Sequence, residues 1–301
     1  MPIRLMQNFR AVFYSPYYAT HALGFYKREG VDVDLLTSDV PGDAVPKLLD
    51  GSVDVTWGGP MRVMKAHDQD SKSPLVSFCE VVSHDPFFLI GKPGAKPFQL
   101  ADLATKNFAS VSEVPTPWMC LQQDLRDQGM DPDTLSRRSD QAMTRNYVSL
   151  KSGDIDVMQT FEPFVSMAEK DGAGEVLYAA SRRGPTTYTA FVATRDACVK
   201  HRDEFAAMTR ATAKMLAWLY ANPVEELAKA VTQFFPDVAP DILLRSLRRY
   251  RDANLWSRET KLIPQGFSQL VKSLHSGGFI ARMPGYDECV EPHLNEIRPG
   301  N

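Results

Sequence analysis

The sequence predicts an α/β protein of two lobes, with doubly wound sheets joined by two hinge strands and a helical C-terminal part. From the first residues on, short segments of strand character alternate with amphipathic ones, which is typical of such sheets. The segment LLDGSVDV at residues 48–55 is matched by LKSGDIDV at residues 150–157, which indicates that the unit recurs. Two apolar runs, at residues 86–91 and 188–194, bracket the second unit, so we expect two crossings between the lobes.

In the first lobe, alternation and apolar character predict three strands. These strands are residues 3–6, 31–35 and 52–57. Ser15 and Pro16 supply an N-cap and a proline at the first helical position, and Gly30 supplies a stop, so we expect one helix between them. The sequence Pro41-Gly42-Asp43 is expected to open the next helix.

In the second lobe, residues 108–111 predict a strand, and residues 117–128 predict a helix that ends at Gly129. After Arg195 the apolar residues follow a spacing of three to four, which predicts helices that pack on the core. The predicted boundaries are residues 1–88 plus 192–301 for lobe I and residues 89–191 for lobe II.

Composition narrows the classes of partner. With 34 Lys and Arg against 37 Asp and Glu, the formal net charge is −3, so the chain lacks the basic field that attracts nucleic acids or anionic lipids. The four cysteines stand singly and the six histidines are dispersed, so we expect buried thiols and neither a metal nor another cofactor. No apolar run approaches the ~18 residues of a membrane span. We expect a monomer that binds a small molecule.

Four segments carry a resemblance to a known superfamily. They are GFYKREGVDV at residues 24–33, GSVDV at residues 51–55, the strand-to-helix region 100–133, and GDIDV at residues 153–157 with the Glu162-Pro163 that follows. Together they resemble the substrate-binding proteins of the nitrate, sulfonate and thiamine-precursor ABC importers, a superfamily that also contains the fungal thiamine-pyrimidine synthases. The resemblance covers essentially the whole chain. It implies a type II periplasmic-binding-protein fold, a small ligand between two lobes that close on it, and an ABC permease as partner.

The resemblance also implies a periplasmic location. The sequence itself enters a strand pattern at Ile3, without the charged and apolar regions of a secretory signal. We therefore expect a periplasmic protein if a signal was removed, and a cytoplasmic one if the sequence is complete.

Ligands of open α/β sheets lie beyond the carboxyl ends of the strands, where loops and helix N-termini meet. The loops that this rule selects are rich in aromatic, charged and amide side chains. The candidate ligand-binding residues are Asn8, Phe9, Arg10, Tyr14, Trp57, Arg62, His84, Glu113, Trp118, Glu162 and Tyr188. Each has a structural alternative, since Trp57 and Trp118 equally suit packing and His84 suits a loop contact.

Carboxylates and rings in these loops favour a planar nitrogen heterocycle as the ligand. Glu113 and Glu162 occupy corresponding places in lobe II, and a carboxylate can accept two parallel N–H bonds there. The alternative role of Glu162 is to complement the dipole of the next helix. Asn8 and Phe9 resemble the pair that pyrimidine-binding members place against the ring. We therefore expect a thiamine-precursor pyrimidine or a similar compound.

Two alternatives remain open. A sulfonate or nitrate would use Arg10 and Arg62, although the two glutamates would oppose an anion. An enzyme on the same fold is the other alternative, but Gly58 and Arg62 stand where the fungal synthases place their pyridoxal-phosphate lysine and the histidine that they consume. A desulfinase- or decarboxylase-type lyase would instead use Cys120, His84 or Arg62. We expect a binding protein rather than an enzyme.

Overall fold

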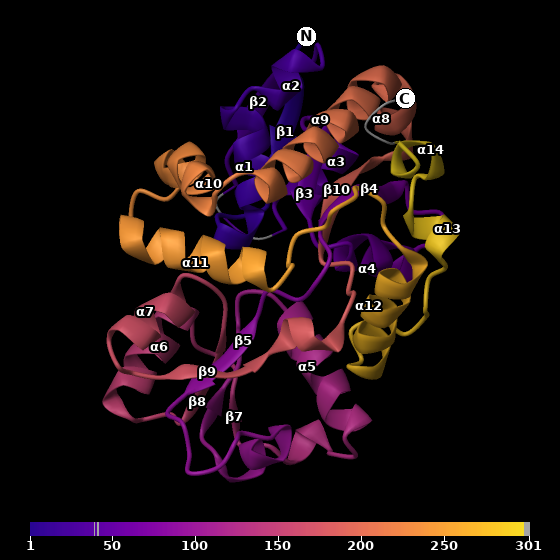
Figure 1. The fold of residues 1–301 in the computed structure, drawn as a ribbon. Coiled ribbons are helices and arrows are strands. Elements are labelled where there is room, and N and C mark those ends of the chain that lie inside the picture. The colour runs from indigo at the N-terminus through magenta and orange to yellow at the C-terminus, as the bar shows by residue number, and fades with distance from the viewer. Residues whose placement is uncertain (39, 41, 298–301) are drawn as a thin grey trace.

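The computed structural model describes residues 1–38, 40 and 42–297, which form two five-stranded sheets flanked by helices (Figure 1). The first sheet has the order β2-β1-β3-β10-β4 and consists of β1 (Ile3–Met6), β2 (Val33–Leu36), β3 (Val55–Gly58), β4 (Leu75–Val82) and β10 (Thr189–Thr194). The second has the order β7-β6-β8-β5-β9 and consists of β5 (Phe88–Gly91), β6 (Phe108–Ala109), β7 (Arg137–Arg138), β8 (Val157–Thr160) and β9 (Glu175–Ala179). The predicted α/β class is confirmed.

Helices connect the strands and form the C-terminal part. Before the second sheet they are α1 (Ser15–Ala22), α2 (Phe25–Arg28), α3 (Ala44–Leu49) and α4 (Met61–Gln69). Within the second sheet they are α5 (Thr116–Asp127), α6 (Met143–Ser152) and α7 (Phe164–Lys170). After β10 they are α8 (Arg195–Lys200), α9 (Arg202–Ala221), α10 (Val224–Val231), α11 (Pro240–Asp252), α12 (Pro264–Ser276), α13 (Tyr286–Cys289) and α14 (Pro292–Asn295). The helical part thus begins at Arg195, as predicted.

The two sheets share one plan. In the first, β1 pairs in parallel with β2 and β3, while β10 runs antiparallel to β3 and β4. In the second, β6 pairs in parallel with β7 and β8, while β5 runs antiparallel to β8 and β9. The chain changes sheet between β4 and β5 and returns between β9 and β10. Because all of β10 pairs within the first sheet, residues 189–191 join that sheet, whereas the predicted boundary places them in lobe II.

The single helix predicted between Ser15 and Gly30 is two helices. Gly24 separates α1 from α2 and adopts a left-handed backbone with φ 72°, which glycine tolerates best. Ser15 does not cap the helix, because its hydroxyl donates to the carbonyl oxygen of Val12 at 2.7 Å in a preceding 3-10 turn. Pro41, expected to help open the next helix, lies outside the described residues.

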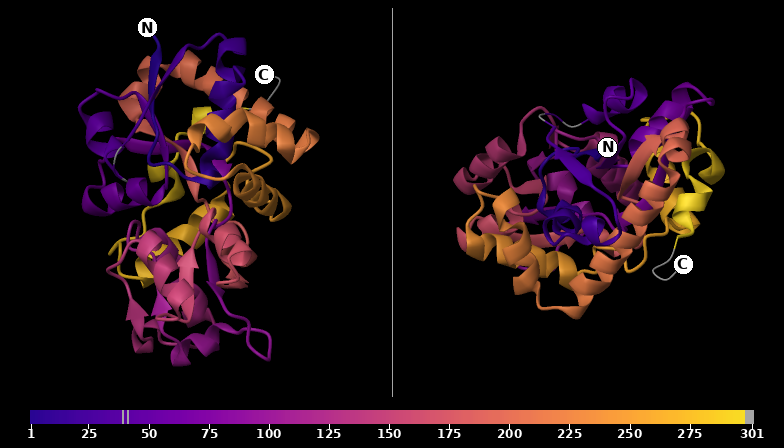
Figure 2. Two further views of the ribbon diagram at one scale, coloured as in Figure 1. Left: turned by 90° about the vertical axis from the view of Figure 1, so that its left-hand side faces the viewer. Right: turned by 90° about the horizontal axis from the view of Figure 1, so that it is seen from above.

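The C-terminal helices reach lobe II on two sides (Figures 1 and 2). Helix α11 packs against α7, and helix α12 packs against α5. An exposed ion pair accompanies each contact, with 2.7 Å between Lys170 Nζ and Asp241 Oδ2 and 3.0 Å between Lys272 Nζ and Asp127 Oδ1. The lobes therefore touch through these helices as well as through the two crossings.

The four cysteines are buried free thiols, as predicted. Of the helices in the described ranges, none is both long and apolar enough to cross a bilayer.

Strand β4 carries an unusual buried acid. Cys79 has a left-handed φ of 56°, and the pairing of β4 with β10 shifts register on both sides of Glu80. Glu80 is 2% exposed, and burial raises its pKa to about 8, although the hydroxyl of Thr187 acts in the opposite direction. The acid is therefore protonated in the folded protein at neutral pH.

Replacing Glu80 by glutamine is expected to flatten the pH dependence of stability. In the wild type, the unfolded acid ionises above about pH 4.5 while the folded acid stays neutral until about pH 8, so stability falls across that interval. Between pH 5 and 7 this loss amounts to about 2 to 3 kcal/mol. Urea unfolding at both pH values measures it. An equal loss in Glu80→Gln would mean that another group causes the pH dependence.

Candidate ligand-binding site

A pocket lies where the carboxyl ends of the first sheet face lobe II. Its lining residues are Asn8, Phe9, Phe13, Tyr14, Gly59, Met61, Arg62, Phe87, Val114, Pro115, Thr116 and Tyr188. Loops after β1, β3 and β6 supply most of them, so the pocket draws on both sheets at the strand ends, where the topology places a ligand. The whole hollow has about 400 Å³, including the part open to solvent, but only about 30 Å³ of it is free for the centre of a water-sized molecule.

The pocket brings together five of the predicted residues, namely Asn8, Phe9, Tyr14, Arg62 and Tyr188. Several apolar wall residues are not among the predicted ones, although each lies close in sequence to a predicted residue or segment. Phe13 precedes Tyr14, Phe87 lies in the first apolar run, and residues 114–116 belong to the loop that follows β6.

Four other predicted residues lie elsewhere. Arg10 is exposed and lines a separate hollow beside Pro163. Trp57 is fully buried, with its ring stacked on that of Tyr17 at 4.9 Å between centroids. His84 is half-buried, and its Nδ1 lies 3.2 Å from Ser83 Oγ. Trp118 packs in the lobe II core beneath the guanidinium of Arg137, 4.2 Å from the ring centre.

Glu113 points away from the pocket. It is exposed, and its carboxylate accepts hydrogen bonds from the Met143 backbone N–H at 2.8 Å and from the Ser112 hydroxyl at 3.2 Å. Because Met143 is the first residue of α6, the carboxylate compensates the unpaired N–H groups of that helix. The structure thus gives Glu113 a structural environment in place of the expected ligand contact.

Glu162 is buried away from the pocket, with its acceptor oxygens already used. It accepts from the backbone N–H of Ser166 at 2.9 Å and from the hydroxyls of Ser166 and Ser246 at 2.8 and 3.1 Å. Arg249 Nε donates to it at 2.7 Å. Since Ser246 and Arg249 lie on α11, the carboxylate fastens lobe II to the C-terminal helices.

Asn8 is held by both ends of its amide. Its Oδ1 accepts a hydrogen bond from the backbone N–H of Gly42 at 3.1 Å, so its NH₂ group faces the Tyr14 hydroxyl at 3.4 Å. Burial raises the pKa of Tyr14 to about 12, which keeps this hydroxyl protonated. Tyr14 can therefore accept from Asn8 and still donate its own proton.

Arg62 is the charged group of the pocket. It sits in the first turn of α4, directly after the loop that leaves β3. Burial lowers its pKa from the ordinary value, and the nearby Tyr14 opposes that change. Within residues 1–38, 40 and 42–297, no carboxylate forms an ion pair with it, and the residues lining the pocket include no acid. The guanidinium therefore offers its N–H donors to a ligand.

Tyr188 also lines the pocket, and phenylalanine rings form the walls. Burial raises the pKa of Tyr188 well above its ordinary value, and its hydroxyl has no partner in the described part of the chain. Phe9 lies 6.0 Å from Phe13 and 5.3 Å from Tyr14 between ring centres, with edge-on geometry. Phe87 completes the aromatic wall. The pocket is thus rich in donors and aromatic surface.

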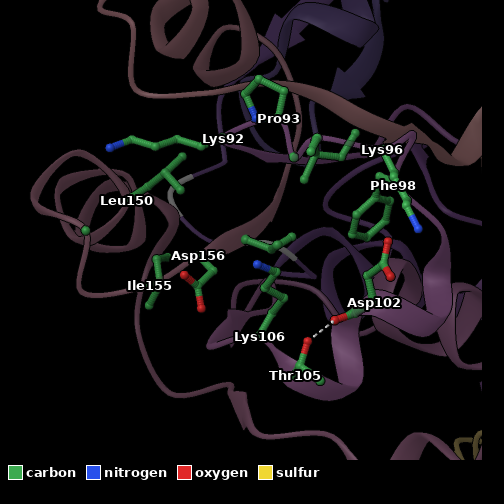
Figure 3. A pocket seen from close by; sticks show the side chains of 15 residues that line it. Lys92, Pro93, Lys96, Phe98, Asp102, Thr105, Lys106, Leu150, Ile155 and Asp156 are labelled. Atoms are coloured by element: carbon green, nitrogen blue, oxygen red, sulfur yellow. Dashed lines mark hydrogen bonds between the residues drawn. The ribbon is translucent and has the colours of Figure 1, made fainter.

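A larger hollow of about 1400 Å³, including the part open to solvent, lies in lobe II, beneath the loop after β5 (Figure 3). Its rim carries Lys92, Lys96 and Lys106, and its floor includes Phe98 and Ile155. In Figure 3 the side chains of Lys92 and Lys96 point to opposite sides, so the cations do not converge on one position. The pocket between the sheets, in contrast, gathers Asn8, Tyr14 and Arg62 around one space.

Neither a metal cluster nor a reactive thiol accompanies the pocket. In the described ranges, no three His, Cys, Asp or Glu side chains are grouped so that they could hold a metal ion. Cys120 is fully buried, and burial raises the pKa of its thiol to about 12. Since the thiolate is the nucleophile, this environment does not favour the role that a lyase would give to Cys120.

Comparisons with known proteins agree with this architecture. The family model described as NMT1/THI5 like matches residues 13–226. The chain is 25% identical over 298 residues to "Putative binding protein YtlA" of Bacillus subtilis (strain 168), covering 98% of this chain and 89% of that protein. The periplasmic aliphatic sulphonate binding protein SsuA from Escherichia coli matches with a TM-score of 0.78 at 13% identity, covering 98% and 99% of the two chains.

A second solved structure extends this likeness. The ligand binding component of an ABC-type import system from Staphylococcus aureus matches with a TM-score of 0.77 at 16% identity, covering all of both chains. The predicted periplasmic-binding-protein fold is therefore confirmed.

Proposed function

This chain belongs to the NMT1/THI5-like family, and from that premise we propose that it is a substrate-binding protein that delivers a small organic anion to an ABC importer. The names of YtlA and of the two solved structures, which describe binding proteins, support a binding role. The partner is then an ABC permease, and the working location is the periplasm or the outer face of the membrane. The protein works as a monomer whose predicted lobes close on the ligand.

The single observation that carries the ligand class is the donor set of the pocket. Arg62 and Tyr14 present N–H and O–H groups, and no acid in the described part of the chain lines the same space. A guanidinium in a partly buried site binds carboxylates and sulfonates well, because it donates two parallel hydrogen bonds. The aromatic walls suit an apolar body. We propose a sulfonate or carboxylate with an aromatic or short aliphatic group.

The two glutamates Glu113 and Glu162 do not oppose an anion in the pocket. The carboxylate of Glu113 caps α6, and that of Glu162 is paired with Arg249. Neither residue lines the pocket.

A thiamine-precursor pyrimidine is the second candidate. The specific observation that favours it is that Asn8 and Phe9 both line the pocket, as the resemblance implies. The N–H and O–H donors of the pocket suit the ring nitrogens of a pyrimidine, which accept hydrogen bonds. The exocyclic amino group would need an acceptor, however, and the lining side chains offer hydroxyl oxygens and an amide that is already engaged.

Thermal unfolding and calorimetry with a small ligand panel test the proposal. The panel consists of butanesulfonate, benzenesulfonate and benzoate, with benzamide as the uncharged match for benzoate and 4-aminopyrimidine for the second candidate. We expect at least one anion to bind, which at 100 times its Kd stabilises the protein by about 2.7 kcal/mol. Benzamide should bind far more weakly. If only the aminopyrimidine binds, the proposed ligand class changes from an anion to a heterocycle.

A further inference from the structure

Gly42 touches two polar groups of the pocket, although it is not among the residues that line it. Its backbone N–H holds Oδ1 of Asn8 at 3.1 Å. This bond orients the amide, because the NH₂ group must then face the other way, toward the Tyr14 hydroxyl. The proton of Tyr14 is left for a ligand. The orientation of one donor therefore depends on the position of the Gly42 backbone.

The side-chain space of residue 42 is occupied by Arg62. A Cβ added to Gly42 would lie 2.5 Å from Nη1 of Arg62 and 3.1 Å from its Cζ. Gly42 also has φ +94°, in the left-handed region that favours glycine. Because the guanidinium is the flexible end of its side chain, a methyl group at position 42 would displace it rather than unfold the loop.

We infer that Gly42 is a positioning residue of the anion site, which seats the guanidinium of Arg62 and, through Asn8, directs the hydroxyl of Tyr14. The inference rests on the proposed function, since it concerns how the same pocket presents its donors. Charged hydrogen bonds depend steeply on geometry, so a guanidinium moved from its seat loses much of its bond to the ligand.

Gly42→Ala tests the seat of Arg62, and Gly51→Ala is its matched control. Gly51 has φ +76°, similar to Gly42, but an added Cβ there meets nothing within 4 Å. Both variants therefore carry backbone strain, and Gly42→Ala alone collides with Arg62. Calorimetry uses whichever of butanesulfonate, benzenesulfonate and benzoate the wild type binds most tightly. We expect Gly42→Ala to weaken binding about 10- to 100-fold and Gly51→Ala to change it less than about twofold.

Combining Gly42→Ala with Arg62→Lys shows whether the loss of affinity comes from displacement of the Arg62 guanidinium or from a general disturbance of the loop. Lysine at position 62 keeps the charge but lacks the planar fork that the added methyl meets. In the Arg62→Lys background, Gly42→Ala is therefore expected to cost less than about threefold in anion affinity. Benzamide binding, where it is measurable, should change little in any variant.

The outcomes distinguish this inference from the function on which it rests. If the wild type binds none of the three anions, the proposed function falls and the role of Gly42 falls with it. If the wild type binds an anion and Gly42→Ala binds it as well as Gly51→Ala does, the positioning role alone is overturned. An equal loss in the Arg62→Lys background would also overturn it, because the effect would then not pass through the guanidinium.

Discussion

Arg62→Met is expected to weaken the binding of a sulfonate or carboxylate by at least about 100-fold. Methionine retains an unbranched apolar chain but removes the charge and the N–H donors. Two charge-assisted hydrogen bonds contribute about 1.5 kcal/mol or more each, and every 1.4 kcal/mol is tenfold in Kd. Calorimetry with the tightest-binding anion of the panel measures the loss.

Arg10→Met is the matched control for this substitution. Arg10 is exposed and lines a different hollow, so its removal should change anion affinity less than about threefold. Both variants should keep the wild-type melting temperature within a few degrees, because neither arginine pairs with an acid in the described residues. Anion binding that survives Arg62→Met would mean that the ligand does not bind the guanidinium.

Much of the fold could be predicted because its signals are local. Alternation at residues 3–6 and 31–35 reflects a sheet face, and the apolar run at residues 188–194 reflects a central strand that neighbours cover on both sides. The break at Gly24 was missed, because a glycine inside a helical pattern is compatible with both a continuous and an interrupted helix.

The site was predicted in part, because strand ends can be located from sequence and tertiary partners cannot. Asn8 and Arg62 follow strands of the first sheet, and both line the pocket. Glu162 also follows a strand, but its carboxylate is taken by Ser246 and Arg249, which lie more than eighty positions later in the chain. No local pattern reveals such a partner.

The same limit explains the expected ligand class. The sequence favours a heterocycle because Glu113 and Glu162 lie in the same set of strand-end loops as the aromatic rings. In the structure, Glu113 instead accepts from the first N–H of α6, and Glu162 pairs with Arg249 of α11. Once both are assigned to those contacts, Arg62 is the one charged residue that lines the pocket in the part of the chain that the structure describes. A prediction of ligand class therefore needs the charges that remain after internal pairing, which only the fold supplies.

Arg183→Met is expected to destabilise the protein by about 3 to 5 kcal/mol, because it leaves two buried carboxylates without their cation. Arg183 donates to Asp124 through Nε at 2.6 Å and Nη2 at 2.5 Å, and to Asp85 through Nη1 at 2.9 Å. The three side chains are 5%, 8% and 1% exposed, respectively. Since Asp85 and Arg183 lie on the two crossings and Asp124 lies on α5, the cluster ties both crossings to lobe II. Urea unfolding at pH 7 measures the effect.

The pH dependence and an exposed ion pair supply the controls. Burial already raises the pKa of Asp85, and Arg183 acts against that rise, so in the variant the carboxylate should protonate more readily and the penalty should shrink as the pH falls toward 4. Lys272→Met breaks the ion pair with Asp127, in which both side chains are half exposed. It should lower the free energy of unfolding by less than about 1 kcal/mol. If Arg183→Met lowers the free energy of unfolding no more than Lys272→Met does, the buried cluster does not hold the crossings. Solvent or a rearranged neighbour would then compensate the two carboxylates.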